Sequence, residues 1–338
     1  MTRKKYFLFA LGAMALAVSV SVAGLLAVDV YYHHKLSTSA GLNVWGYRGP
    51  TVGRKKPGER RVVVVGESTA FGYGVQWQDA IPASLEERLN RQSPSHGQPI
   101  SVVNLGYNNE GAHSYKFTLQ DYEYLDYDAV VFYSGYNDLG GPNSSVFRHT
   151  SPIFRMTGYF PILPIVIREK SMVILSGGNL ESAYWGKKTV FKPSIAQRTV
   201  GSALAAVATV SESLDRQLTR TIPDPTDDAT AEGAECGDRW AHYCGGMYTA
   251  VKYALDHRKK VIITTQPYMN ENHIDQQQRL VTFLRHRFGN HPSLRFTNLG
   301  DAVRLTDPAM CYDGMHLTAA GNQVIAEKLA GPVSEMLR

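Results

Sequence analysis

A serine near the start of the chain and an aspartate–histidine pair near its end have the residue types that build a hydrolytic nucleophile. Ser68 directly follows the apolar run 62–65, and Asp313 and His316 lie three residues apart. A hydroxyl becomes a good nucleophile only when a base takes its proton, and a carboxylate best orients that base. The spacing lets the carboxylate reach Nδ1 of the imidazole and leaves Nε2 free for the serine. These residues predict a serine hydrolase.

The elements that must position these residues alternate between strand and helix from residue 61 onward. Buried parallel strands read as continuous apolar runs, whereas helices show apolar residues at helical spacing. The expected strands are Arg61–Val65, Ile100–Asn104, Ala129–Ser134, Lys260–Thr265 and Leu294–Asn298, and the expected helices are Pro82–Arg91, Tyr115–Leu125, Met247–Asp256, Asn272–Phe288 and Thr318–Leu337. Strands separated by helices form a parallel sheet with right-handed connections. We expect an α/β fold with about five parallel strands and a long insertion after the third.

Three candidate groups follow three successive strands and would therefore meet at the carboxyl edge of the sheet. Ser68 follows the first strand, a loop that ends at Gly111 follows the second, and Asn137 follows the third. A glycine N–H and an asparagine amide could both donate to a developing oxyanion. Taken singly, each has a plainer interpretation, such as a helix N-cap for Ser68 or a turn for Asn137. Together on one edge they favour a catalytic site.

Four short blocks together resemble the SGNH hydrolases, also called the GDSL esterase/lipase family. They are Gly66-Glu67-Ser68, Asn104–Gly111, Gly135-Tyr136-Asn137-Asp138 and Asp313-Gly314-Met315-His316. The resemblance implies a three-layer, flavodoxin-like fold from about 61 to 335, without the insertion. It also implies that Ser68 is the nucleophile, His316 the base and Asp313 its orienting group. The N–H groups of Ser68 and Gly111 and the Asn137 amide would form the oxyanion hole.

The chain departs from the family pattern in two places. Glu67 stands where the family motif has aspartate, which adds one methylene beside the nucleophile. The second block is longer than usual, so Gly111 rather than Gly106 is our choice of oxyanion donor. The segment 66–70 lacks the fifth-position glycine of the α/β-hydrolase nucleophile elbow, which argues against that fold.

The amino terminus predicts a membrane anchor. Residues Arg3–Lys5 are basic, and Tyr6–Val28 contains no charge and is long enough to cross a bilayer as a helix. The positive-inside rule places the basic residues in the cytoplasm and the rest of the chain on the extracytoplasmic, periplasmic side. The alternative is a cleaved signal peptide with a small-residue site at Ser21-Val22-Ala23, which would give a secreted protein.

The expected domain organisation follows from these elements. Residues 1–28 form the signal anchor, 29–58 a juxtamembrane linker, and 59–338 the hydrolase domain, with its insertion at about 141–237. Within the insertion, the apolar and proline-broken run Tyr159–Ile167 is too short to span a membrane. It could be an apolar cap on the sheet, or a lid or membrane-dipping element over the active site.

Composition and cysteine content narrow the remaining possibilities. The net charge of +5 includes the three basic residues at the start, and no basic stripe interleaved with aromatics suggests nucleic acid as a partner. Cys236 and Cys244 flank a short polar loop and could form a disulfide, although three reduced cysteines, with Cys311, are also compatible. No Cys/His spacing suggests zinc. We expect neither a metal nor an organic cofactor.

The predicted function is that of a membrane-anchored, outward-facing serine esterase. It would hydrolyse a carboxylic ester, either an acetyl group on an envelope glycan or a lipid acyl ester, through an acyl-serine intermediate. A glycan O-acyltransferase with the same intermediate is one alternative. A catalytically idle module that binds a glycan or a partner is another. The other histidines, His113, His149, His242 and His273, are expected at the surface without a carboxylate partner.

Overall fold

The structure of the protein is a computed structural model that describes residues 3–37, 41–92, 99–167 and 229–338. The chain divides into two compact units. One comprises Met1–Leu36 and Phe160–Thr221, and the other comprises Ser37–Tyr159 and Ile222–Arg338. The greater part of the predicted insertion, 168–228, lies outside the described residues.

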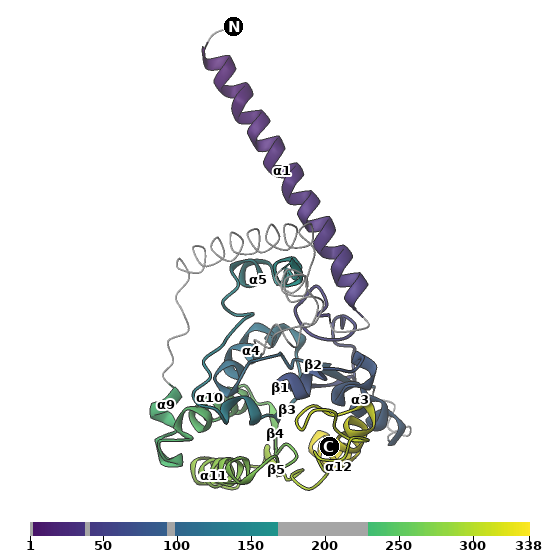
Figure 1. Cartoon of the computed structure of the whole chain (residues 1–338), viewed down its shortest axis with the longest axis vertical. Helices are drawn as coiled ribbons and strands as arrows, with labels where there is room; N and C mark the ends of the chain where they lie inside the picture. Colours follow the sequence, from purple (N-terminus) through teal and green to yellow (C-terminus); the bar gives the residue numbers. More distant parts are fainter. Residues whose placement is uncertain (1–2, 38–40, 93–98, 168–228) are drawn as a thin grey trace, which may run out of the picture. The chain divides into compact units, whose positions relative to one another are not determined.

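A parallel sheet of five strands forms the centre of the second unit (Figure 1). Its strands are β1 (Arg60–Gly66), β2 (Ile100–Asn104), β3 (Ala129–Tyr133), β4 (Lys260–Thr264) and β5 (Leu294–Thr297). They are hydrogen-bonded in the order β2-β1-β3-β4-β5, and every pair is parallel. This is the flavodoxin-like strand order, in which the direction of winding reverses between β1 and β3. The predicted fold class is confirmed.

Helices cover both faces of this sheet and make the fold three-layered. The α-helices described in this unit are α2 (Ser68–Phe71), α3 (Ile81–Gln92), α4 (Tyr115–Asp121), α5 (Pro152–Thr157), α9 (Ala229–Glu232), α10 (Ala241–Asp256), α11 (Glu271–Phe288) and α12 (Ala319–Leu337). α3 packs against α12 on one face, and α10 packs against α4 and α11 on the other (Figure 1). Successive side chains of a strand point to opposite faces, so Val62 and Val64 of β1 join the core under α3 and α12. All residues of β3 are buried, as a strand covered on both faces requires.

The segment predicted as a linker contributes buried residues to the second unit. Tyr47 is 1% exposed and Arg48 is 3% exposed. The N–H of Arg48 donates to the carbonyl oxygen of Asn104 at the end of β2. Part of the stretch 29–58 is therefore packed against the sheet. No local sequence pattern indicates this contact.

The amino-terminal helix α1 (Arg3–Leu36) continues past the predicted boundary at residue 28. Among the described residues it is the one helix long and apolar enough to cross a membrane, and such a helix can be an anchor or a signal sequence. Near its end, Nε2 of His33 lies 3.3 Å from Oδ2 of Asp29. Asp29 accepts the N–H of Leu163, and His33 Nε2 lies 2.9 Å from the carbonyl oxygen of Phe160. Within the first unit, the end of α1 is thus bound to the start of the insertion.

The cysteines are resolved as one bonded pair and one free thiol. Cys236 and Cys244 form a disulfide, and Cys311 is free and buried. Cys244 lies in α10, so the disulfide fixes the chain just before that helix to its first turn. The disulfide that the sequence left open is therefore present.

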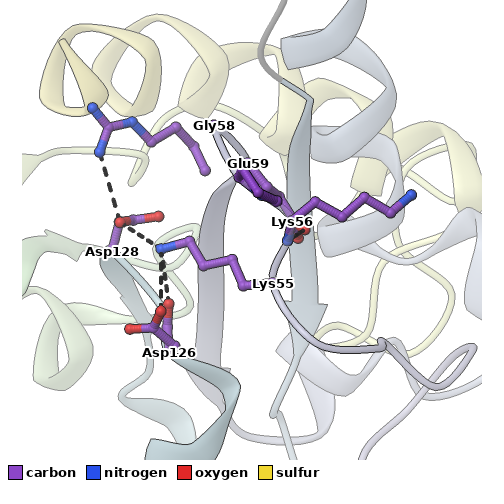
Figure 2. A pocket seen from close by; sticks show the side chains of 8 residues that line it. Lys55, Lys56, Gly58, Glu59, Asp126 and Asp128 are labelled. Carbon is purple, nitrogen blue, oxygen red and sulfur yellow. Dashed lines mark hydrogen bonds and ion pairs between the residues drawn. The ribbon is translucent and has the colours of Figure 1, made fainter.

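A polar hollow opens at the amino ends of β1 and β3 (Figure 2). In it, Nζ of Lys55 pairs with Asp128 at 2.8 Å and with Asp126 at 3.8 Å. Arg60 also pairs with Asp128, at 3.7 Å. These ion pairs join the residues before β3 to those at the start of β1. The hollow lies at the amino edge of the sheet, whereas Ser68 lies at the opposite, carboxyl edge.

Candidate active site

Ser68 occupies the sharp turn between β1 and α2, at the carboxyl edge of the sheet. The preceding Glu67 is extended and caps α2, so Ser68 is the first residue of the helix. A Cβ at Gly66 would lie 2.1 Å from the carbonyl oxygen of Tyr133, so only glycine lets β1 and β3 approach this closely. As the first helical residue, Ser68 has no partner for its N–H inside α2. The strand end therefore presents both the hydroxyl and an N–H of the same residue.

The Asp–His pair comes from the loop before α12 and reaches Ser68. His316 Nε2 lies 2.9 Å from Ser68 Oγ, and Nδ1 lies 2.6 Å from Oδ2 of Asp313. Oδ1 of Asp313 accepts the N–H groups of Met315 and His316 at 3.0 and 2.7 Å. Partial burial alone would raise the pKa of Asp313, but these hydrogen bonds and the imidazole charge outweigh it and lower the pKa. The carboxylate is thus held ionised and oriented towards the imidazole.

The other two predicted oxyanion donors, Asn137 and Gly111, belong to adjoining loops. Asn137 lies in a short 3-10 turn after β3, and its amide Nδ2 donates to the carbonyl oxygen of Glu110 at 2.9 Å. A Cβ at Gly111 would lie 2.7 Å from the carboxylate of Asp138, so this position needs glycine for a steric reason. The N–H of Gly106 donates to Oδ1 of Asn104 at 3.0 Å. That Asn137 and Gly111 contact a substrate stays a prediction.

Glu67 joins the nucleophile turn to the turn that carries Asn137. Its side chain is fully buried, and Oε1 accepts the N–H of Gly135 at 2.9 Å and the hydroxyl of Ser134 at 3.2 Å. Burial raises the pKa of this carboxyl to about 7, although the hydrogen bonds oppose the rise. Burial and the charge of Glu67 also raise the pKa of the neighbouring Asp138 well above its usual value. Two carboxyl groups are therefore buried together near the carboxyl edge of the sheet.

Gln266, just past β4, makes a second bridge between the same two turns. Its Oε1 accepts the N–H of Tyr136 at 3.0 Å, and its Nε2 donates to Oγ1 of Thr69 at 2.7 Å. The side chain is fully buried. Our sequence reasoning missed Gln266, although a polar residue at the carboxyl end of a strand is the signal that identified Ser68 and Asn137. It also missed Tyr73 and Tyr312, whose rings lie beside His316, and Arg48, which donates to carbonyl groups of the turn that carries Tyr73.

The expectation for the remaining histidines was wrong in three cases. His273 is fully buried against the ring of Tyr136, and burial lowers its pKa to about 4. His113 is 7% exposed, and His149 lies 2.8 Å from a carboxylate oxygen of Asp121. The contacts of His273 with Tyr136 and of His149 with Asp121 join distant parts of the chain, which explains why spacing gave no indication of them. Within the described ranges, no group of three His, Cys, Asp or Glu residues could hold a metal ion.

Comparisons with known proteins find similarity in structure. No family model matches the chain, and no curated protein matches it. A solved structure described as a lipolytic protein of the G-D-S-L family, from Desulfitobacterium hafniense, has 11% identity and a TM-score of 0.41. The match covers 82% of this chain and 99% of that one.

Two further solved structures are similar over the same share of this chain, 82%. A psychrotrophic esterase from a Pseudoalteromonas species has 9% identity and a TM-score of 0.43, with 99% of its chain covered. A family 3 carbohydrate esterase from Clostridium thermocellum has 11% identity and a TM-score of 0.44, with 98% covered. A G-D-S-L family protein and two esterases are thus among the structures to which this chain is similar. At these low sequence identities the similarity describes the fold alone.

Proposed function

We propose that this protein is a serine esterase that hydrolyses a carboxylic ester through an acyl intermediate on Ser68. The observation that carries the proposal is the hydrogen-bonded series from Ser68 Oγ through His316 to Asp313, with distances of 2.9 and 2.6 Å. Ser68 and His316 are both partly exposed, so a substrate can reach the hydroxyl. A hydroxyl, an imidazole and an oriented carboxylate in this order are the parts that acyl transfer needs.

The first half-reaction forms the acyl-enzyme. His316 Nε2 takes the proton of Ser68 as Oγ attacks the ester carbonyl carbon, and Asp313 stabilises the imidazolium that results. The carbonyl oxygen becomes an oxyanion, which accepts hydrogen bonds from the N–H groups of Ser68 and Gly111 and from the Asn137 amide. The bond to the alcohol oxygen then breaks, and His316 donates its proton to the leaving alkoxide.

The second half-reaction returns the enzyme to its starting state. A water molecule takes the place of the alcohol, and His316 removes its proton as the water oxygen attacks the acyl carbon. The acid leaves when Ser68 Oγ regains a proton from the imidazole. The hydrogen bond of Asn137 to Glu110 supports the assigned oxyanion role, because it fixes the amide while leaving its second N–H available.

We further propose that α1 anchors the protein in a membrane with the catalytic unit on the extracytoplasmic side. The basic start of the chain supports this orientation under the positive-inside rule. The disulfide Cys236–Cys244 also supports it, because disulfides persist in oxidising compartments. Cleavage after a signal sequence would leave the same catalytic unit as a secreted protein.

The test uses the full chain in a mild detergent, beside Ser68→Ala. Hydrolysis of para-nitrophenyl esters with acyl chains from acetate to dodecanoate is measured, together with labelling by a fluorophosphonate probe. We expect turnover and labelling that both disappear in Ser68→Ala. A probe that does not react with the folded wild-type protein would refute the proposal and favour a binding module.

The acyltransferase alternative shares the acyl-serine, so a second measurement separates it from hydrolysis. Acyl transfer to an added oligosaccharide is compared with release of free acid at the same ester concentration. Free acid as the main product supports the esterase. Acylated oligosaccharide as the main product would assign the acyl-serine to a transferase.

A further inference from the structure

Two half-exposed tyrosine rings border the imidazole of His316. The ring centre of Tyr73 lies 4.9 Å from that of His316, and the ring centre of Tyr312 lies 5.9 Å from it. The hydroxyl of Tyr312 donates to the carbonyl oxygen of Tyr73 at 2.6 Å. The two residues are 47% and 45% exposed. This pair, which we call the Tyr73/Tyr312 platform, offers aromatic surface to solvent directly beside the base.

A buried arginine holds the turn that carries Tyr73. Arg48 is 3% exposed, and its guanidinium donates to the carbonyl oxygens of Phe71 and Gly72 at 2.6 and 2.5 Å. It also donates to the carbonyl oxygen of Val75. Hydrogen bonds from a charged donor are stronger than those between neutral groups. Three of them on one short turn fix an exposed tyrosine in a defined place.

The second ring of the platform is fixed just as firmly. The N–H of Tyr312 donates to the carbonyl oxygen of His316 at 3.1 Å. A Cβ at Gly74 would lie 2.1 Å from the Tyr312 hydroxyl, so glycine is required for the two chain segments to meet. Gly74 also has a φ of 86°, which other residues rarely adopt. The platform is therefore preorganised before any ligand arrives.

The position of the platform indicates which part of an ester it would touch. In the proposed mechanism, His316 Nε2 donates a proton to the leaving alkoxide, so the alcohol part of the ester lies against the imidazole. The acyl part lies towards the Ser68 N–H and Asn137, which bind the carbonyl oxygen. Side chains that flank His316 thus contact the alcohol part. The platform would consequently contact the alcohol part of the ester and not the acyl chain.

We propose that the Tyr73/Tyr312 platform binds a sugar ring, so that the alcohol part of the substrate is an O-acylated glycan. This inference rests on the proposed esterase function. A pyranose has a face of C–H groups that packs on an aromatic ring, and a rim of hydroxyls that stays in water. Half-exposed, rigid tyrosine rings suit such a ligand, because they combine an apolar face with a wet edge. Stacking needs an aromatic ring, whereas an apolar chain needs only apolar volume.

The experiment compares Tyr73→Phe with Tyr73→Leu in the full-length protein in detergent. Acetate release is measured from acetylated xylo-oligosaccharides and from ethyl acetate, whose alcohol is too small to stack. In Tyr73→Leu we expect kcat/KM for the sugar ester to fall about tenfold, mainly through KM, and at least about fivefold more than for ethyl acetate. Tyr73→Phe should stay within about threefold of wild type on the sugar ester, because it keeps the ring.

The matched control is Tyr124→Leu, which removes another exposed tyrosine, 59% exposed, that neighbours Tyr122. It should change neither activity by more than about twofold. The sugar assignment would be overturned if Tyr73→Leu lost the same factor in kcat/KM on both esters. It would also be overturned if Tyr73→Leu were as active on the sugar ester as Tyr73→Phe. In those cases Ser68-dependent hydrolysis of ethyl acetate would still support the proposed esterase function. Absence of Ser68-dependent turnover of either ester would refute the esterase itself.

Discussion

Replacement of Glu67 by glutamine should remove a pH dependence of stability that this buried carboxyl creates. The pKa of Glu67 is raised from 4.5 to about 7 by burial. As pH rises from 4.5, the unfolded chain loses this proton while the folded protein keeps it. The folded state therefore becomes less stable as pH rises towards 7, and stays at the lower stability above that value. The difference in pKa corresponds to about 3 kcal/mol, at 1.36 kcal/mol for each pH unit.

In Glu67→Gln this fall should be absent, because the amide has no proton to lose. Glutamine can still accept the Gly135 N–H through its oxygen, but its buried NH₂ group would cost about 1–3 kcal/mol if unpaired. We therefore expect the variant to be less stable than wild type at pH 5 and to recover by about 2.5 kcal/mol relative to it at pH 8. Asp138 is coupled to Glu67, so its own titration adds to the fall in wild type.

The measurement is urea unfolding of the full chain in detergent at a series of pH values, followed by tryptophan fluorescence. Glu59→Gln is the matched control. Burial alone would raise the pKa of Glu59, but hydrogen bonds from Lys56 and Ser101 and the charge and hydrogen bond of Arg61 lower it to about 2. Glu59 is ionised in both states between pH 5 and 8, so its substitution should shift stability by a constant amount. Parallel curves for wild type and Glu67→Gln over that range would refute the reasoning.

Three other substitutions test the site and its support. Asn137→Ala should lower kcat by roughly 10²–10³ if the amide stabilises the oxyanion, and a loss below about threefold would exclude that role. Gln266→Leu removes the donor to Thr69 and should lower both the unfolding free energy, by about 1–3 kcal/mol, and the single-turnover acylation rate. A stability loss with an unchanged acylation rate would make Gln266 purely structural. Replacing Cys236 and Cys244 by alanine should cost about 2.5 kcal/mol with kcat unchanged, and an unchanged urea midpoint would contradict the loop-closure argument.

The sheet and the hydrogen-bonded series Ser68–His316–Asp313 could be predicted from sequence because each depends on a local signal. Buried parallel strands are apolar runs, and the chemistry of acyl transfer demands a few residue types just beyond the strand ends. Ser68 is the clearest case, since the turn after β1 can expose only one or two side chains. His316 and Asp313 could be paired because their spacing is short. Each of these residues could be singled out without knowledge of the contact between the distant segments that carry Ser68 and His316.

The supporting residues could not be predicted, because their roles depend on such contacts. Arg48 lies in a segment that reads as a linker, and its function depends on carbonyl groups of a turn beyond β1. Gln266 lies just past β4 and bridges the turns that follow β1 and β3. The sequence also could not decide whether Cys236 and Cys244 form a disulfide, because spacing alone cannot show that two Cβ atoms face each other. Propensity and periodicity describe single elements, not the groups that meet between them.

The contacts of Glu67 give a physical reason why a glutamate, and not the aspartate of the family motif, precedes Ser68. Oε1 of Glu67 reaches across to β3 and accepts the N–H of Gly135 at 2.9 Å. An aspartate would hold its carboxylate back by about one C–C bond, about 1.5 Å, which exceeds the tolerance of a hydrogen bond. Gly135 has a φ of 150° and admits no side chain, because a Cβ there would lie 2.3 Å from Gln277. An aspartate at position 67 would therefore lose this hydrogen bond unless the turn that carries Asn137 moved. Glu67 and this turn would have to change together, so the residue before Ser68 is coupled to the position of Asn137.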